Sequence, residues 1–187
     1  MDAASQYALA YALTTTAGVR AIVALAGVAV AAHFGFFHPP GSFAWLASPA
    51  AMWVLVGVGA LELIADKVPI LDHAGHFIQV ATKPAAAAIL VGGSVHAQST
   101  ATLATLMVLG GLNALGVHAG IAALRGASTV TTGGVANPAV STAEDVGTIG
   151  SLFVAFLAPF VAAFLAITFT VLLLVFARTA FRRLRAH

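Results

Sequence analysis

Long apolar segments separated by short polar ones run through the whole chain, and they restrict its fold more than any other feature. Of the 187 residues, 60% are hydrophobic and only 7% are charged, whereas a soluble domain carries about 25% charged residues. Several segments approach the ~20 residues that a helix needs to cross a bilayer, and a helix satisfies its own backbone hydrogen bonds there. We therefore predict an all-α polytopic membrane protein, with residues 1–187 forming a single membrane domain.

The composition also excludes several classes of protein. The net charge of +2 is small and the basic residues form no stripe, so we expect no nucleic-acid partner. The chain has no cysteine, which excludes disulfides, thiolate metal sites and iron–sulfur ligation, and we expect no cofactor. Residues 1–20 lack the basic region and cleavage site of a secretory signal, so they are predicted to begin a retained first helix.

About five transmembrane helices are predicted, with the lipid bilayer as their surroundings. The apolar segments cover residues 8–36, 49–65, 70–97, 103–124 and 148–177. Pro159 is expected to bend the last of them. Four of the eight basic residues lie in the C-terminal tail, which the positive-inside rule places in the cytoplasm, although Lys67 and Arg125 then fall on the outer side.

The first and third segments each contain polar residues that a lipid-facing helix would not tolerate. Arg20 lies within the first segment, so it must snorkel to the interface, pair with another group or face a wet cavity. In the third segment a kink is expected at Pro84, and four polar residues form one helical stripe: Asp72, His76, Gln79 and Lys83. The alternative is an interfacial helix over 70–84 before a short span.

Residues 125–147 form a polar, glycine-rich connector between the fourth and fifth segments. Gly133-Gly134 followed by Asn137-Pro138 suits either a re-entrant or broken element or an exposed loop, because irregular backbone at membrane depth must be buried or line a cavity. We expect this Thr-Gly-Gly and Asn-Pro part to be buried. Ser141 and Glu144 fit a capping box at the start of the fifth helix.

A weak internal repeat relates the two halves of the chain. Short motifs recur in the same order at offsets of 93, 89 and 90 residues: Gly18-Val19-Arg20-Ala21 with Gly111-Leu112-Asn113-Ala114, Ser48-Pro49-Ala50 with Asn137-Pro138-Ala139, and Pro69 with Pro159. The candidate halves are residues 8–69 and 101–177, joined by a polar-to-apolar helix over 70–97. Three spans between equivalent positions would give the halves opposite orientations, as in the inverted-topology repeats of many transporters.

Three stretches of the chain together resemble a known family. They read ELIADKVPILD from Glu62, GLNA from Gly111 and TVTTGGVANPAVSTAED from Thr129. The chain is similar over nearly its whole length to a bacterial membrane family called domain of unknown function 4126. The resemblance implies a multi-pass protein of the bacterial cytoplasmic membrane but no established activity. One departure is Arg20, where a residue like Asn113 would be expected.

Polar residues of the family's pattern, with His76 from the polar stripe of the third segment, supply the candidate binding positions for an ion or small solute. These are Glu62, Asp66, Lys67, Asp72, His76, Asn113, Thr132, Asn137, Glu144 and Asp145. Carboxylates in a membrane helix are costly unless paired or functional, so the group around Asp66 is either a proton or cation path or a structural ion-pair network. His73 and His76 are weak metal-ligand candidates. The group around Glu144 either binds a cation or polar solute or caps a helix.

These features favour a channel or secondary transporter for an ion or small solute. The alternative is a non-transporting scaffold or accessory subunit, whose polar groups only hold helices together. A membrane enzyme or lipid-handling protein is a distant third, because the sequence contains neither a metalloprotease motif nor a nucleophile elbow, and no residue is assigned as catalytic. The small-residue helices also suggest a homo-oligomer or a larger membrane complex.

Overall fold

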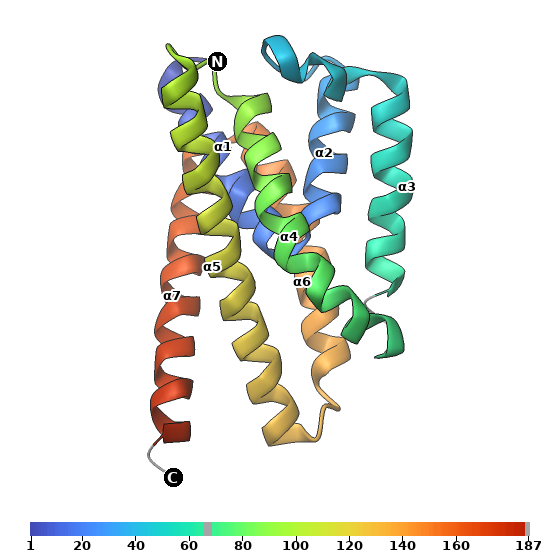
Figure 1. The fold of residues 1–187 in the computed structure, drawn as a ribbon, viewed down its shortest axis with the longest axis vertical. Coiled ribbons are helices and arrows are strands. Elements are labelled where there is room, and N and C mark those ends of the chain that lie inside the picture. The colour runs from blue at the N-terminus through green and yellow to red at the C-terminus, as the bar shows by residue number, and fades with distance from the viewer. Residues whose placement is uncertain (66–68, 186–187) are drawn as a thin grey trace.

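The computed structural model describes residues 1–65 and 69–185, with the backbone alone at 69–77, 180, 181 and 183–185. Its elements are α1 (Ala3–Val19), α2 (Ala21–His33), the 3-10 helix η1 (Gly41–Ala47), α3 (Pro49–Ala65), α4 (Pro69–Ser94), α5 (Thr100–Thr132), α6 (Asn137–Leu157) and α7 (Pro159–Arg185) (Figure 1). The described residues contain helices and no strand, so the predicted all-α class is confirmed.

The first predicted span is broken into two helices at Arg20. The backbone of Arg20 is extended, with φ −133° and ψ 100°, so α1 ends one residue before it and α2 begins one residue after it. The start of α1 and the chain that follows the end of α2 both lie at the C-terminal end of α4. The backbone N–H of His96 donates to the side-chain oxygen of Gln6 at 2.8 Å, and Phe43, which follows α2, packs on Gly92.

The pair α1–α2 is therefore a helical hairpin and not one tilted span. In Figure 1, α1 runs from the N-terminal end toward the middle of the molecule, and α2 returns to the same end. The prediction of a single helix over 8–36 is wrong. The bend has no proline, and the hydrogen bonds that satisfy its free N–H groups come from a distant helix, as described below.

Two predicted helices begin at the expected prolines. α3 begins at Pro49 and ends at Ala65, as predicted, and it is bent by 67° relative to η1. α4 begins at Pro69 and continues through Pro84, so residues 70–84 belong to one long helix and do not form a separate interfacial helix. Proline suits a helix start because its missing N–H has no partner to lose there.

The expected connector over 125–147 is instead the end of α5, a tight turn and the first half of α6. Gly133 and Gly134 close the turn with φ of 62° and 86°, a region that favours glycine. Thr131 and Thr132 donate their hydroxyl protons to carbonyls four residues back, so the polar sequence continues the helix. Both threonines are exposed, so the expectation that this part is buried is wrong for them.

The predicted fifth helix over 148–177 is two helices. α6 ends at Leu157, Ala158 leaves the helical region with φ −147° and ψ 74°, and α7 begins at Pro159. The residue before a proline is disfavoured in helical geometry, and Pro159 therefore ends one helix and begins the next. Its expected role of bending a continuous helix is a second error of the same kind as the one at Arg20.

Three helices are long and apolar enough to cross a membrane, namely α5, α6 and α7, and η1 with α3 makes a fourth candidate if the bent pair counts as one span. Three to four candidate spans among the described residues do not confirm the predicted five. Large apolar side chains also cover the outer surface, including Trp53, Phe153 and Phe164. Such a surface suits lipid and not water, and the chain is an integral membrane protein.

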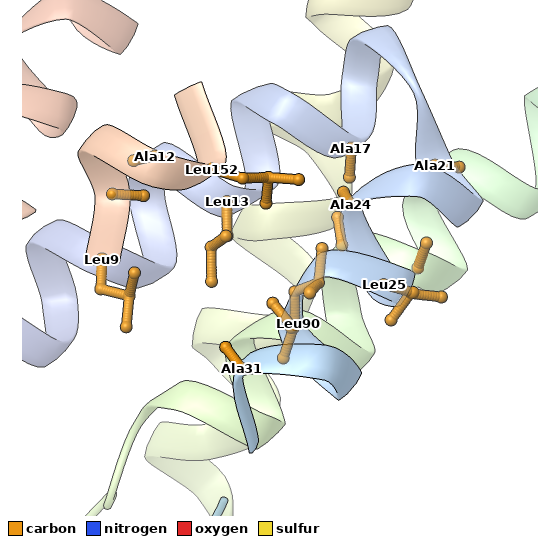
Figure 2. Close-up of a cluster of buried hydrophobic side chains, with 14 of the residues drawn as sticks. Leu9, Ala12, Leu13, Ala17, Ala21, Ala24, Leu25, Ala31, Leu90 and Leu152 are labelled. Carbon is orange, nitrogen blue, oxygen red and sulfur yellow. The ribbon is translucent and has the colours of Figure 1, made fainter. Parts of the chain in front are cut away.

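The α1–α2 hairpin lies at the centre of the fold. Its side chains supply much of the main core, with Leu9, Leu13 and Leu25 packed near Leu90 of α4 and Leu152 of α6 (Figure 2). Small residues bring the backbones close together. A Cβ on Gly18 would lie 2.6 Å from Cβ of Val117 on α5, so only glycine fits there.

Candidate functional site

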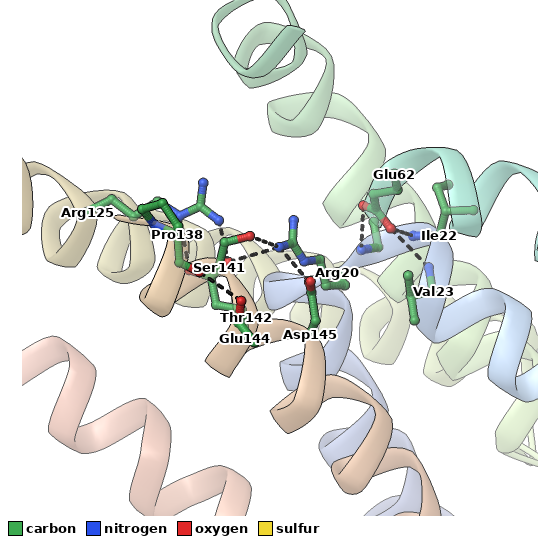
Figure 3. A network of polar contacts seen from close by, with 11 residues as sticks. Arg20, Ile22, Val23, Glu62, Arg125, Pro138, Ser141, Thr142, Glu144 and Asp145 are labelled. Atoms are coloured by element: carbon green, nitrogen blue, oxygen red, sulfur yellow. Dashed lines mark hydrogen bonds and ion pairs between the residues drawn. The ribbon is translucent and has the colours of Figure 1, made fainter. Parts of the chain in front are cut away.

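The bend at Arg20 leaves backbone N–H groups at the start of α2 without partners inside that helix. The carboxylate of Glu62, near the end of α3, accepts hydrogen bonds from three of these N–H groups (Figure 3). Oε1 lies 3.1 Å from the N of Ala21, and Oε2 lies 3.0 Å from the N atoms of Ile22 and Val23. Glu62 therefore caps α2 from another helix and places a negative charge at its positive end.

The side chain of Arg20 turns away from Glu62 toward α6. Its Nη2 donates to Oγ of Ser141 at 3.1 Å and lies 2.7 Å from Oδ1 of Asp145 and 3.6 Å from Oε2 of Glu144. The residue is only 2% exposed. A guanidinium buried this deeply is stable only when paired, and charge-assisted contacts of this kind are the strong ones.

A second arginine holds Glu144 from α5. Arg125 donates from Nε to Oε1 at 3.0 Å and from Nη2 to Oε2 at 2.6 Å, in the bidentate geometry that guanidinium and carboxylate prefer. Glu144 thus lies between two arginines, one at the hairpin bend and one on α5. The bend, α3, α5 and α6 are tied together by one polar network, which we call the bend network: Arg20, Glu62, Arg125, Ser141, Glu144 and Asp145.

Further buried polar groups lie along the neighbouring helices. Nζ of Lys83 on α4 lies 2.8 Å from Nδ1 of His118 on α5, and the two residues are 3% and 7% exposed. Asn113 on α5 donates from Nδ2 to the hydroxyls of Thr14 and Thr15 on α1, at 2.9 Å each. The hairpin is therefore in polar contact with α5 as well as with α3 and α6.

A cavity of about 500 Å³ lies between α1, α5, α6 and α7 and reaches the bend network at Glu144. Most of its lining is apolar, with hydroxyl groups from Thr15, Thr16, Thr148 and Ser151. The network is therefore not sealed on every side. A small molecule in this cavity would contact one carboxylate of the network and a few hydroxyls.

The structure brings together some of the predicted site residues and separates others. Glu62, Glu144 and Asp145 converge on the Arg20 bend from two helices. Thr132 and Asn137 instead bond locally at the α5–α6 turn. Asn113 binds α1. The remaining candidates lie outside the described residues, or have only their backbone described: Asp66, Lys67, Asp72, His73 and His76.

The predicted capping box of the fifth helix is wrong, and the predicted metal ligands are not tested by the described side chains. α6 begins at Asn137, so Ser141 and Glu144 lie inside the helix and do not form its capping box. Among the side chains that the structure describes, no group of three or more His, Asp or Glu residues could hold a metal ion. His73 and His76 have no described side chains, so that prediction stays open to experiment.

Sequence reasoning missed the basic half of the site. The available signal for Arg20 is its position inside an apolar segment, which requires a partner, but the sequence does not identify that partner. Arg125 was expected on an outer loop, and its partnership with Glu144 follows only once α5 and α6 are known to form a hairpin. Lys83 belongs to the predicted polar stripe of the third segment, but no local signal in the sequence indicates its pairing with His118.

A family model matches residues 7–179 of the chain, and its description is Domain of unknown function (DUF4126). The match covers most of the chain, so the protein belongs to this family, as the resemblance predicted. No curated protein and no solved structure matches the chain.

Proposed function

We propose that this member of the DUF4126 family is a channel or secondary transporter for an ion or small solute, and that the bend network is its binding site. The observation that carries the proposal is the buried break at Arg20. Non-helical backbone at membrane depth is tolerated only where protein or a water-filled cavity surrounds it. Many transporters place their substrate at such discontinuous helices, where half-helix ends supply partial charge.

The charges at the break support the same proposal. Glu144 and Asp145 face the side chain of Arg20, and Glu62 binds the backbone of the three residues that follow it. Buried carboxylates in membrane proteins usually mark ion pathways, proton relays or substrate sites. Because α2 starts at the bend, a change in the charge of Glu62 would act directly on the position of that half-helix.

The cavity beside Glu144 offers a route to the network. It lies between α6 and the hairpin, where Thr16 and Ser151 share a hydrogen bond of 2.9 Å across the helices. A solute or hydrated ion entering there would meet Glu144 first. In the described conformation Arg125 and Arg20 already occupy its carboxylate, so we regard this conformation as a closed one.

We also propose that the chain contains an inverted repeat of helix pairs. Helices begin at equivalent prolines in the two halves of the chain. α3 begins at Pro49 and α6 at Asn137-Pro138, and in the same way α4 begins at Pro69 and α7 at Pro159. The hairpin bend departs from the repeat, because α5 continues as one helix through Asn113, the counterpart of Arg20. On this proposal the arginine-rich C-terminus is cytoplasmic.

A scaffold or accessory subunit is the second candidate function, and one observation favours it. The polar atoms of Glu62 and Glu144 are fully engaged, by three backbone N–H groups and by the Arg125 fork. Such pairing would hold four helices together without any ligand. A self-associating scaffold would use the small-residue helix surfaces for contact with further copies or other subunits.

Flux measurements on purified protein in liposomes separate the two candidates. We expect wild type to carry protons, a monovalent cation or a simple anion, and Glu144→Gln to reduce that flux to the level of empty liposomes. Thr132→Ala, at the exposed α5–α6 turn, is the control and should keep the wild-type flux. Wild type that folds and inserts correctly but carries none of these ions would support the scaffold instead.

A further inference from the structure

Lys83 and His118 form a buried pair of two basic side chains. Nζ lies 2.8 Å from Nδ1, which is hydrogen-bond distance. A hydrogen bond between two nitrogens needs a proton on one and a lone pair on the other. The ammonium of Lys83 and an imidazolium protonated at Nδ1 therefore cannot occupy this geometry together, and the pair holds one ionisable positive charge.

The surroundings of the pair make that charge sensitive to its neighbours. Both residues are nine-tenths or more buried, and among the described side chains no carboxylate forms an ion pair with Lys83. Four charged groups of the bend network act on Lys83 through space: Glu62 of α3, Glu144 of α6, Arg20 of the bend and Arg125 of α5. Of the other helices that pack on α4, α1 carries no charged side chain and α2 carries only His33 as a titratable group.

Close helix packing holds the pair in place. On α5, Gly111 and His118 are two turns apart and share a face, and that face lies against α4. A Cβ on Gly111 would lie 3.3 Å from Cβ of Pro84, the residue after Lys83. The tight contact at Gly111 brings the two backbones near enough for the lysine side chain to reach the imidazole ring.

We propose that Lys83 and His118 form a proton-binding site in the membrane core, separate from the arginine–carboxylate pairs of the bend network. The pair carries one positive charge when a proton is bound and none when it is released. On release, an N–H bond of the Lys83 ammonium breaks, its electron pair stays on Nζ, and water takes the proton. His118 keeps its proton on Nε2 throughout and offers the lone pair of Nδ1.

The role of this site deepens the proposed transport function and rests on it: the proton is the ion whose movement is coupled to the bend network. Neutralising Lys83 removes a positive charge that acts on Glu62 and Glu144. Those carboxylates in turn hold the start of α2 and the side chains of Arg20 and Arg125. Binding of a proton and opening of the bend are linked in this way through charge.

Nitrogen NMR of histidine-labelled full-length protein in lipid nanodiscs tests the site without any flux measurement. The chain has seven histidines, and His118→Gln identifies the signals of His118 by subtraction. Between about pH 5 and pH 8, the range in which an unperturbed imidazole gains its second proton, we expect His118 to keep one protonated and one bare ring nitrogen. Lys83→Met should shift the signal of the bare nitrogen, whereas Lys83→Arg, which still donates, should largely preserve it.

Two results would overturn the inference. Wild-type His118 signals that become those of an imidazolium over that range would show that the histidine and not Lys83 takes up the proton, and a bare-nitrogen signal unchanged by Lys83→Met would show that no hydrogen bond exists. Flux is read separately, with Lys83→Arg as the variant that keeps its charge but cannot release a proton. Liposomes that carry nothing, combined with the expected NMR result, would reject the transport function while the proton site stands.

Discussion

Nη2 of Arg20 lies 2.7 Å from Oδ1 of Asp145, and this contact joins the bend of the central hairpin to the first half of α6. The two residues are 125 positions apart in the chain. Their pairing places a guanidinium that would be prohibitively costly alone in a membrane core beside the groups that compensate it. The stability of the hairpin therefore depends on charges supplied by another helix.

Removing the guanidinium should strongly destabilise the protein. We expect Arg20→Met to lower the free energy of unfolding by about 3–5 kcal/mol, because it removes the buried guanidinium that pairs with Asp145 and lies beside Glu144. The double variant Arg20→Met with Asp145→Asn should recover part of that loss. Unfolding in denaturing detergent, followed by circular dichroism, measures both, and Arg178→Met on the exposed face of α7 is the control. Additive losses in the double variant would contradict a direct pairing.

Glu62 should control the order of the first turn of α2. Glu62→Ala leaves three N–H groups without their acceptor, at a cost of about 1–3 kcal/mol for each group that stays buried and unsatisfied. We expect faster hydrogen exchange at residues 21–23 and little change in α5. Glu62→Gln keeps one acceptor oxygen and should give a smaller effect. Exchange measured by mass spectrometry that is equal in wild type and Glu62→Ala would refute the cap.

The contact of Gly18 with α5 should not tolerate a methyl group. In Gly18→Ala the new Cβ would lie 2.6 Å from Cβ of Val117 and 2.8 Å from the carbonyl oxygen of Ala114, so the helices must separate, at a cost of about 1–3 kcal/mol. Gly57→Ala on α3 meets no atom within 4 Å and is the matched control. It should be neutral or slightly stabilising, because alanine favours a helix. Equal loss in both variants would rule out the close approach as the cause.

Cysteine labelling can test the topology, because the native chain has no cysteine. The loop after α2 and the α4–α5 loop lie at one end of the molecule, and the α5–α6 turn lies at the other (Figure 1). In intact cells, an impermeant maleimide should therefore give His38→Cys and Gln98→Cys the same labelling and Val135→Cys the opposite one. All three residues are exposed. Labelling of all three from one side would contradict a membrane-crossing α5.

Local sequence signals predicted the helices that begin at proline. Pro49 and Pro69 begin α3 and α4 at the expected places, since proline pre-forms a first helical turn and loses no hydrogen bond there. Pro159 carried the same signal, but the sequence alone did not distinguish a bend from a new helix. In the α5–α6 region, threonine hydroxyl groups donate to backbone carbonyls of their own helix. Because these residues are polar, the sequence was predicted to be a loop although it is helical.

Part of the site was accessible from sequence because buried charges are rare in a chain of this kind. Glu62 is a carboxylate within an apolar segment, Glu144 and Asp145 are carboxylates of the polar connector, and all three meet at the bend. Their partners were not accessible in the same way. The fork between Arg125 and Glu144 needs the turn at Gly133 and Gly134, and the contact between Lys83 and His118 needs α4 and α5 packed closely side by side.

The amino-acid sequence by itself determined that this protein is a helical membrane protein of the DUF4126 family, because hydropathy and local motifs are properties of neighbouring residues. Only the tertiary structure decided that the first apolar segment is a hairpin. Glu62 and Asp145, which lie far from Arg20 in the sequence, supply acceptors for its bend from α3 and α6. A helix break inside a membrane is stable only when distant groups satisfy it, so its position follows from packing and not from local propensity.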